Sequence, residues 1–101
     1  MIYNKKNFVS ILITNYNKEK FLNKSIKSCL KQKFLKKEII VFDDCSNDKS
    51  LKILKKFSKI KVIKNKKKKY LSGPLNQIYG LLKIFKKSKG EIIFFLDSDD
   101  E

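Results

Sequence analysis

The sequence predicts an α/β protein, a three-layer sandwich in which three helices cover a mainly parallel sheet of about four strands. Short apolar runs rich in Ile, Val and Phe alternate with longer segments whose apolar residues recur every three or four positions. The runs are apolar at nearly every position, which is typical of parallel strands buried on both faces. With 101 residues the chain has the length of one small domain, and we expect residues 1–101 to form it.

Four apolar runs are the expected strands, and polar residues follow three of them directly. The first strand leads into Thr-Asn-Tyr-Asn at residues 14–17, and the second leads into a pair of aspartates at residues 43–44. The last leads into Asp-Ser-Asp-Asp at residues 97–100. The four strands are expected at residues 8–14, 38–42, 60–63 and 92–96.

Three segments between these strands have the apolar spacing of amphipathic helices. We expect helices over residues 18–33 and 49–58, and a third helix that begins at Pro74 and ends at Gly90. The residues expected to face the core are Leu22, Ile26, Cys29 and Leu30 in the first helix, Leu51, Leu54 and Phe57 in the second, and Ile78, Leu81, Leu82 and Phe85 in the third.

The expected topology brings the polar segments together. Right-handed crossovers between parallel strands place all the carboxyl ends on one edge of the sheet. Ligands bind at that edge in open parallel sheets. We therefore expect residues 14–17, 43–46 and 97–100 to form a single site.

The basic residues are all lysines. The formal net charge is +15, with 25 lysines and neither Arg nor His. Without His the usual general base at neutral pH is absent, and without Arg so is bidentate recognition of phosphate or guanine. An AT-rich genome explains the excess of lysine equally well, so the charge alone does not identify a partner.

The cysteines and the apolar segments bear on the compartment. Cys29 and Cys45 lack the spacing of a metal site and are expected to be reduced. No apolar run approaches the roughly 20 residues of a membrane span, and no signal-peptide core follows the first lysines. We expect a cytoplasmic protein. A peripheral contact with the inner face of the membrane is a further option, through the five lysines of residues 64–69, hereafter the lysine run.

Negative charge is concentrated in two places. Seven of the ten acidic residues lie in two clusters, at residues 43–48 and 97–101. Carboxylates brought together repel one another, and a divalent cation relieves that repulsion. Mg²⁺ and Mn²⁺ take oxygen ligands, often one or two carboxylates and a substrate phosphate. Helix caps and solvated loops are the alternative explanation, which suits Asp48 better than the three aspartates after the last strand.

Three stretches together resemble the successive signatures of the family 2 inverting glycosyltransferases. These enzymes have the GT-A fold, whose amino-terminal half is Rossmann-like. The resemblance implies a nucleotide-sugar donor, Mg²⁺ or Mn²⁺ as cofactor, and transfer of a sugar to a glycan or lipid-linked acceptor, as in cell-surface polysaccharide biosynthesis. The stretches are residues 9–17 (VSILITNYN), 38–48 (EIIVFDDCSND) and 90–100 (GEIIFFLDSDD).

The resemblance also assigns roles at the first two strand ends. Thr14 and Tyr16 match positions that hold the nucleotide base, and Asn17, which follows them in the same motif, is also assigned to the nucleotide-sugar. Asp44 matches the acid that contacts the base, usually uracil, and Asp43 supports it. A UDP-sugar is therefore the favoured donor.

At the last strand end the resemblance implies contacts to the donor and the metal. Asp97 and Ser98 are assigned to the donor, and Asp99 and Asp100 to the metal, because they match the Asp-x-Asp motif. Asn76 lies where the family often has Arg-Asn near the donor. The residue before it in this chain is Leu75, in place of the family's Arg.

Members of the family continue past the Asp-x-Asp motif with an acceptor site and an acidic general base. We expect that base beyond Glu101, so the catalytic residue is unknown and the chain is expected to be a truncated, donor-binding half. Cys45 stands where the family usually has Gly.

Two other functions compete with donor binding. A non-catalytic module would bind nucleic acid or an anionic membrane through the lysine run. Tyr70 is the only aromatic residue beside the run, so no specific nucleic acid is expected, and a solvated loop is the plainer reading. A phosphoacceptor receiver domain has its acid pair after the first strand, whereas here the pair follows the second.

Overall fold

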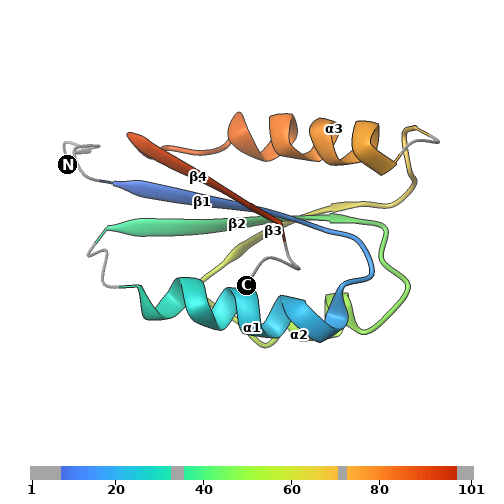
Figure 1. The fold of residues 1–101 in the computed structure, drawn as a ribbon, viewed down its shortest axis with the longest axis horizontal. Helices are drawn as coiled ribbons and strands as arrows, with labels where there is room; N and C mark the ends of the chain where they lie inside the picture. Colours follow the sequence, from blue (N-terminus) through green and yellow to red (C-terminus); the bar gives the residue numbers. More distant parts are fainter. Residues whose placement is uncertain (1–7, 33–35, 71–72, 98–101) are drawn as a thin grey trace.

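The computed structural model describes residues 8–32, 36–70 and 73–97, with the backbone alone at Asp97. Strands and helices alternate along the chain, and the predicted three-layer α/β sandwich is confirmed. Helix α3 covers one face of the sheet, and α1 and α2 cover the other (Figure 1). The elements are β1 (Val9–Asn15), α1 (Glu19–Lys31), β2 (Lys37–Asp44), α2 (Ser50–Leu54), β3 (Lys61–Asn65), α3 (Gly73–Phe85) and β4 (Ile92–Asp97).

The sheet has the strand order β3-β2-β1-β4, and every pairing is parallel. In register, Thr14 lies between Phe42 on β2 and Asp97 on β4, and Asn15 lies beside Asp43. The carboxyl ends of β1, β2 and β4 therefore meet at one edge, as the topology predicted.

Alternate residues of the central strands pack against the two helical layers, which gives the protein two hydrophobic cores. The core on the side of α1 and α2 contains Val9, Ile11, Ile13, Leu22, Ile26, Cys29, Ile39, Val41 and Leu54. The core on the side of α3 contains Leu12, Ile40, Phe42 and Ile84. The larger core includes Cys29 as predicted, and burial raises the pKa of its thiol.

The face of α3 that packs on the sheet is not the predicted apolar stripe. Its buried residues are Asn76, Gly80 and Ile84. A Cβ at Gly80 would overlap the Phe42 ring, so the glycine lets the helix approach the sheet closely. Apolar spacing did not reveal this face because two of its three residues are Gly and Asn.

The predicted stripe of α3 lies largely in solvent. Ile78 is 53% exposed and Leu82 57%, and Phe85 is exposed as well. These side chains and Leu81 border an apolar hollow beside Phe95 of β4. The prediction that this stripe faces the core was therefore wrong for its exposed members.

All three helices end earlier than predicted, and α2 ends at Leu54 rather than at residue 58. After α2 the chain continues as turns, in which the N–H groups of Lys56 and Phe57 donate to the carbonyls of Ile53 and Leu54. Phe57 still packs against the larger core, as predicted. Among the described residues no helix is both long and apolar enough to cross a membrane.

Gly90 has a different role from the helix end predicted for it. Helix α3 ends at Phe85, whose carbonyl accepts from the Ser88 hydroxyl at 2.6 Å. A Cβ at Gly90 would lie 2.5 Å from the Ser10 hydroxyl and 2.9 Å from the Phe8 carbonyl oxygen. The glycine is therefore needed where the segment before β4 passes close to β1.

Glu38, at the amino end of β2, links three neighbouring segments. Its Oε2 accepts from the Ser10 hydroxyl and from the Lys89 N–H, both at 2.6 Å, and its Oε1 accepts from Lys61 Nζ at 3.3 Å. Burial raises the pKa of Glu38, but these hydrogen bonds outweigh it and leave the pKa below its ordinary value. The carboxylate therefore fastens β1, β3 and the segment before β4 to β2.

Candidate functional site

A pocket of about 240 Å³ opens at the carboxyl edge of the sheet. Residues from the end of β1, from β2, from the lysine run and from the first turns of α3 surround it. The lining residues are Thr14, Asn15, Tyr16, Lys18, Phe42, Asp44, Lys68, Gly73, Asn76 and Gln77. Four of the predicted donor-binding residues, Thr14, Tyr16, Asp44 and Asn76, are thus brought together.

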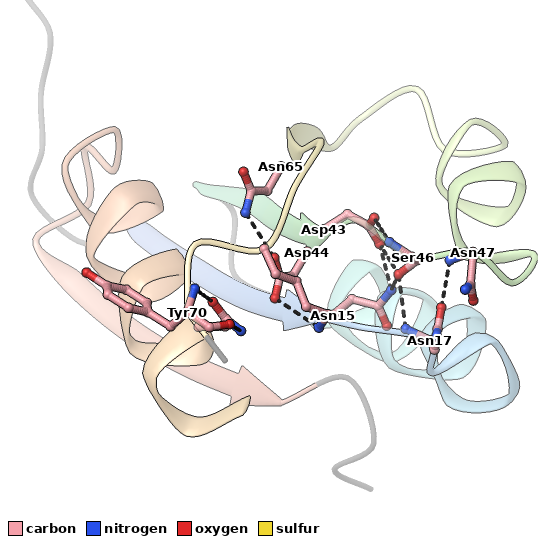
Figure 2. A network of polar contacts seen from close by, with 10 residues as sticks. Asn15, Asn17, Asp43, Asp44, Ser46, Asn47, Asn65 and Tyr70 are labelled. Carbon is pink, nitrogen blue, oxygen red and sulfur yellow. Dashed lines mark hydrogen bonds and ion pairs between the residues drawn. The ribbon is translucent and has the colours of Figure 1, made fainter. Parts of the chain in front are cut away.

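Asp43 lies behind the pocket and holds two loops in place. Its side chain is buried, and Oδ1 accepts from Asn15 Nδ2 at 2.9 Å and from the Ser46 hydroxyl at 2.7 Å (Figure 2). The other oxygen, Oδ2, accepts from the Ser46 N–H at 3.0 Å. Asp43 thereby fixes the loop after β2 against the end of β1, which is consistent with the supporting role predicted for it.

Asn17 joins the same two loops. Its Oδ1 accepts from the N–H groups of Asn47 at 2.8 Å and Asp48 at 3.3 Å, and its own N–H donates to Ser46 Oγ at 3.0 Å (Figure 2). Its φ of 51° is left-handed, a conformation that Asn tolerates better than most residues. Within the described residues Asn17 positions the loops, and its contact with a donor stays a prediction.

The Asp44 carboxylate lines the pocket, and both of its oxygens have partners. Oδ1 accepts from Asn65 Nδ2 at 3.0 Å, and Oδ2 lies 3.5 Å from Lys68 Nζ (Figure 2 draws the Asn65 contact). Asn65 ends β3 and Lys68 belongs to the lysine run. The acid predicted to contact a base is therefore held by the segment that follows β3.

Tyr16 provides a flat apolar surface next to this carboxylate. Its side chain is 42% exposed, and Lys68 Nζ lies 3.2 Å from the ring centroid, in a cation–π contact. One ammonium group thus touches both the Tyr16 ring and Asp44. An aromatic face beside a hydrogen-bonding carboxylate suits a nucleobase, which has a flat face for stacking and polar edges.

Asn76, in the first turns of α3, is buried and lines another part of the pocket. Its Oδ1 accepts from the Tyr70 N–H at 2.9 Å, and its Nδ2 donates to the Tyr70 carbonyl at 2.8 Å. The oxygen and the nitrogen of the Asn76 amide are therefore both hydrogen-bonded to the backbone of Tyr70. Asn76 ties the segment that carries Lys68 to α3.

The acidic motif after β4 falls mostly outside the described residues. The backbone of Asp97 ends β4 in register with Thr14, whereas the Asp97 side chain, Ser98, Asp99 and Asp100 are not among the residues described. Within the described ranges no group of three His, Cys, Asp or Glu side chains could hold a metal ion. The metal ligands therefore stay a prediction.

The lysine run is not uniform in the structure. Lys66 and Lys67 are exposed, Lys69 Nζ lies 4.8 Å from the Tyr79 ring centroid, and Lys68 lines the pocket. Neither Lys68 nor Asn65 was predicted from the sequence to be at the site. One feature of the sequence could have indicated them. Asp44 was predicted to lie in the pocket, where its carboxylate needs hydrogen-bond donors, and the lysine run follows the neighbouring strand.

Comparison with known proteins was made on both sequence and structure. The profile of glycosyl transferase family 2 matches residues 10–101, whereas a search of curated proteins found no match. S. aureus TarS 1-349 is 31% identical with a TM-score of 0.75, and the match covers 92% of this chain and 28% of that one. In its complex with UDP-GlcNAc, TarS 1-349 is 30% identical with a TM-score of 0.75, over 91% of this chain and 26% of that one.

A more distant structure has the same fold. The mannosyltransferase PcManGT from Pyrobaculum calidifontis, in complex with GDP-Man and Mn²⁺, is 16% identical with a TM-score of 0.76. The match covers 90% of this chain and 27% of that one, and at this identity it shows the fold alone. This chain therefore spans about a quarter of the length of these solved structures.

Sequence and structure lead to the same assignment. The family profile covers nearly all of the described sheet and helices, and the structural match to TarS 1-349 extends over 92% of the chain. The chain belongs to glycosyl transferase family 2, and its fold is that of the GT-A enzymes.

Proposed function

We propose that this chain binds the nucleotide-sugar donor of a glycosyltransferase, and that the donor is a UDP-sugar. The observation that carries the proposal is the pocket in which one ammonium group contacts both the Tyr16 ring and the Asp44 carboxylate. The two side chains are therefore close enough to receive one nucleobase between them. TarS 1-349 in complex with UDP is 32% identical over 91% of this chain, which supports uracil as the base.

In this proposal each pocket residue has its own role toward the nucleotide. The base stacks on Tyr16 and donates an N–H to Asp44, while Thr14 and Asn76 form the wall around it. Asp43 and Asn17 do not need to touch the donor, because their hydrogen bonds hold the loops that carry Tyr16 and Asp44.

A divalent cation, Mg²⁺ or Mn²⁺, is part of the same proposal. Asp99 and Asp100 would hold it, and Asp97 and Ser98 would face the donor. Carboxylate oxygens suit these hard cations, and the backbone of Asp97, where β4 ends, is in register with Thr14 at that edge of the sheet. When bound, the cation supplies Lewis-acid stabilisation to the leaving nucleoside diphosphate.

The reaction that we propose for the bound donor is transfer of its sugar to an acceptor. A hydroxyl group of a glycan or lipid-linked acceptor attacks the anomeric carbon as the bond to the diphosphate oxygen breaks, with inversion. No described residue is assigned as the base that takes the hydroxyl proton. A non-catalytic module has only exposed lysines in its favour, so it ranks below donor binding.

The test is a calorimetric titration of the chain with UDP in the presence of Mg²⁺. We expect Asp44→Asn to weaken binding about tenfold or more, because a hydrogen bond to a charged group contributes about 1.5–3 kcal/mol. Glu91→Gln is the matched control, since it removes one negative charge from an exposed residue at the opposite edge of the sheet. Equal affinities for the wild type and Asp44→Asn, or no UDP binding by the folded wild type, would refute the proposed function.

A further inference from the structure

Lys68 occupies the space that the proposed function gives to a nucleobase. Its Nζ lies 3.2 Å from the centroid of the Tyr16 ring. That separation is close to the contact distance between stacked atoms, about 3.5–4 Å. A base that stacks on the same ring face therefore cannot enter while the ammonium group stays there.

The second contact of Lys68 leads to the same conclusion. Its Nζ lies 3.5 Å from Asp44 Oδ2, and the carboxylate's other oxygen already accepts from Asn65. An N–H of an incoming base would meet the ammonium group at Oδ2. Both groups that would recognise the base are thus engaged by one lysine.

We infer that Lys68 exchanges partners when the nucleotide binds: the base displaces its ammonium group from Tyr16 and Asp44, and the diphosphate receives it. This inference rests on the proposed function and adds a determinant of phosphate preference to that site. No covalent step is involved. One set of contacts with a positive charge replaces another.

The chemistry of the side chain suits such an exchange. Lysine is a compact positive charge on a flexible four-carbon stem, whereas the planar guanidinium of arginine is more rigid. The chain has no Arg, so side-chain positive charge for a diphosphate comes from lysines alone. The Lys68 side chain is 34% exposed, which leaves it room to move, and Asn76 holds the backbone nearby through Tyr70.

Charge balance gives the exchange a direction. In the structure Lys68 partly neutralises Asp44, whose side chain is only 9% exposed. When a base covers Asp44 and donates an N–H to it, the ammonium group is released next to a ligand with two phosphates. Hydrogen bonds between an ammonium group and phosphate are among the strong, charge-assisted ones.

The experiment compares uridine with UDP, which differ only in the diphosphate. Amide shifts of the ¹⁵N-labelled chain are followed during titration with each ligand, in EDTA so that no metal contributes. The measured quantity is the ratio of the Kd for uridine to the Kd for UDP. We expect Lys68→Met to lower this ratio about tenfold, with tighter binding of uridine and weaker binding of UDP.

Two further variants separate a local effect from one of net charge. Lys67→Met removes the same charge from an exposed neighbour and is expected to leave the ratio within about twofold. Lys68→Arg keeps the charge and is expected to restore most of the preference for UDP.

The outcomes are distinct. If Lys68→Met and Lys67→Met change the ratio equally, or if Lys68→Met strengthens the binding of both ligands by the same factor, the exchange is overturned. If the wild type binds UDP and Lys68→Met leaves the ratio unchanged, this inference fails while the proposed function stands. A folded wild type that binds neither ligand in EDTA also overturns the exchange, while the proposed function is decided separately by the UDP titration with Mg²⁺.

Discussion

Cys45 holds a backbone conformation that glycine adopts more readily. Its φ is 49°, in the left-handed region, and it lies between the buried Asp43–Asp44 pair and Ser46. A residue with a Cβ pays about 1–2 kcal/mol there, although glycine loses about 0.5–1 kcal/mol of entropy on folding. The resemblance to a family with Gly at this position thus has a local physical basis.

Cys45→Gly is expected to raise the free energy of unfolding by about 0.5–1 kcal/mol relative to Cys45→Ala. The Ala variant removes the thiol but keeps the conformational cost, so the comparison isolates the backbone term. Urea denaturation measures both variants. A Gly variant less stable than the Ala variant would show that the left-handed conformation is not the stable one in solution.

At the residue scale, the sequence identified the side chains that follow strands directly. Thr14, Tyr16 and Asp44 are at the pocket because a parallel sheet delivers them to one edge. Lys68 could not be identified from the sequence, because a run of identical lysines has no periodicity that distinguishes the one facing the pocket.

Helix α3 presents two faces of different chemistry, and the buried one is the less apolar in composition. Ile84 is fully buried against Leu12, Ile40 and Phe42, while Leu82, two residues earlier, is 57% exposed. Burial, not hydrophobicity, therefore decides what each side chain contributes to stability.

Ile84→Ala is expected to lower the free energy of unfolding by about 2–5 kcal/mol, because it leaves a cavity in the smaller core. Leu82→Ala in the same helix is expected to cost less than about 1 kcal/mol, as surface substitutions do. Thermal or urea unfolding compares them directly. Equal losses would mean that the stripe with Leu82 is buried in solution after all.

At the element scale, the apolar runs predicted all four strands along the chain. The central strands β1 and β2 are buried nearly throughout because helices cover both of their faces. The packed face of α3 was not predictable in the same way. Gly80 is buried for lack of a side chain and Asn76 for its hydrogen bonds to Tyr70, and neither cause appears in a hydrophobic pattern.

Across the whole molecule, two of the described acids, Asp48 and Glu38, have folded-state pKa values below their ordinary ones and so couple stability to pH; the more buried of the two is Glu38. Its folded-state pKa lies below the ordinary value: burial raises it, but hydrogen bonds from Ser10, Lys89 and Lys61 outweigh that effect. The unfolded chain, with a Glu pKa of about 4.3, then binds the proton more readily. The stabilisation is fully present above about pH 5 and is lost as the pH falls through the lower, folded-state pKa.

Glu38→Gln is expected to make the free energy of unfolding depend less on pH in this range. Urea unfolding between about pH 3 and 6 should show the stability of the wild type falling with acid more steeply than that of the variant. Glu91→Gln, at an exposed carboxylate near the same edge of the sheet, should keep the wild-type slope. Parallel pH profiles for the wild type and Glu38→Gln would rule out this role.

The exposed stripe of α3 also governs how copies of the chain behave toward one another. Ile78, Leu82 and Phe85 offer apolar surface that water disfavours, while a formal net charge of +15 keeps copies apart. Salt shortens the range of that repulsion, to about 10 Å at 0.1 M, and leaves the apolar attraction in place. Colloidal stability is therefore expected to be greatest at low ionic strength, where repulsion between the lysines of different copies opposes association through the apolar stripe of α3.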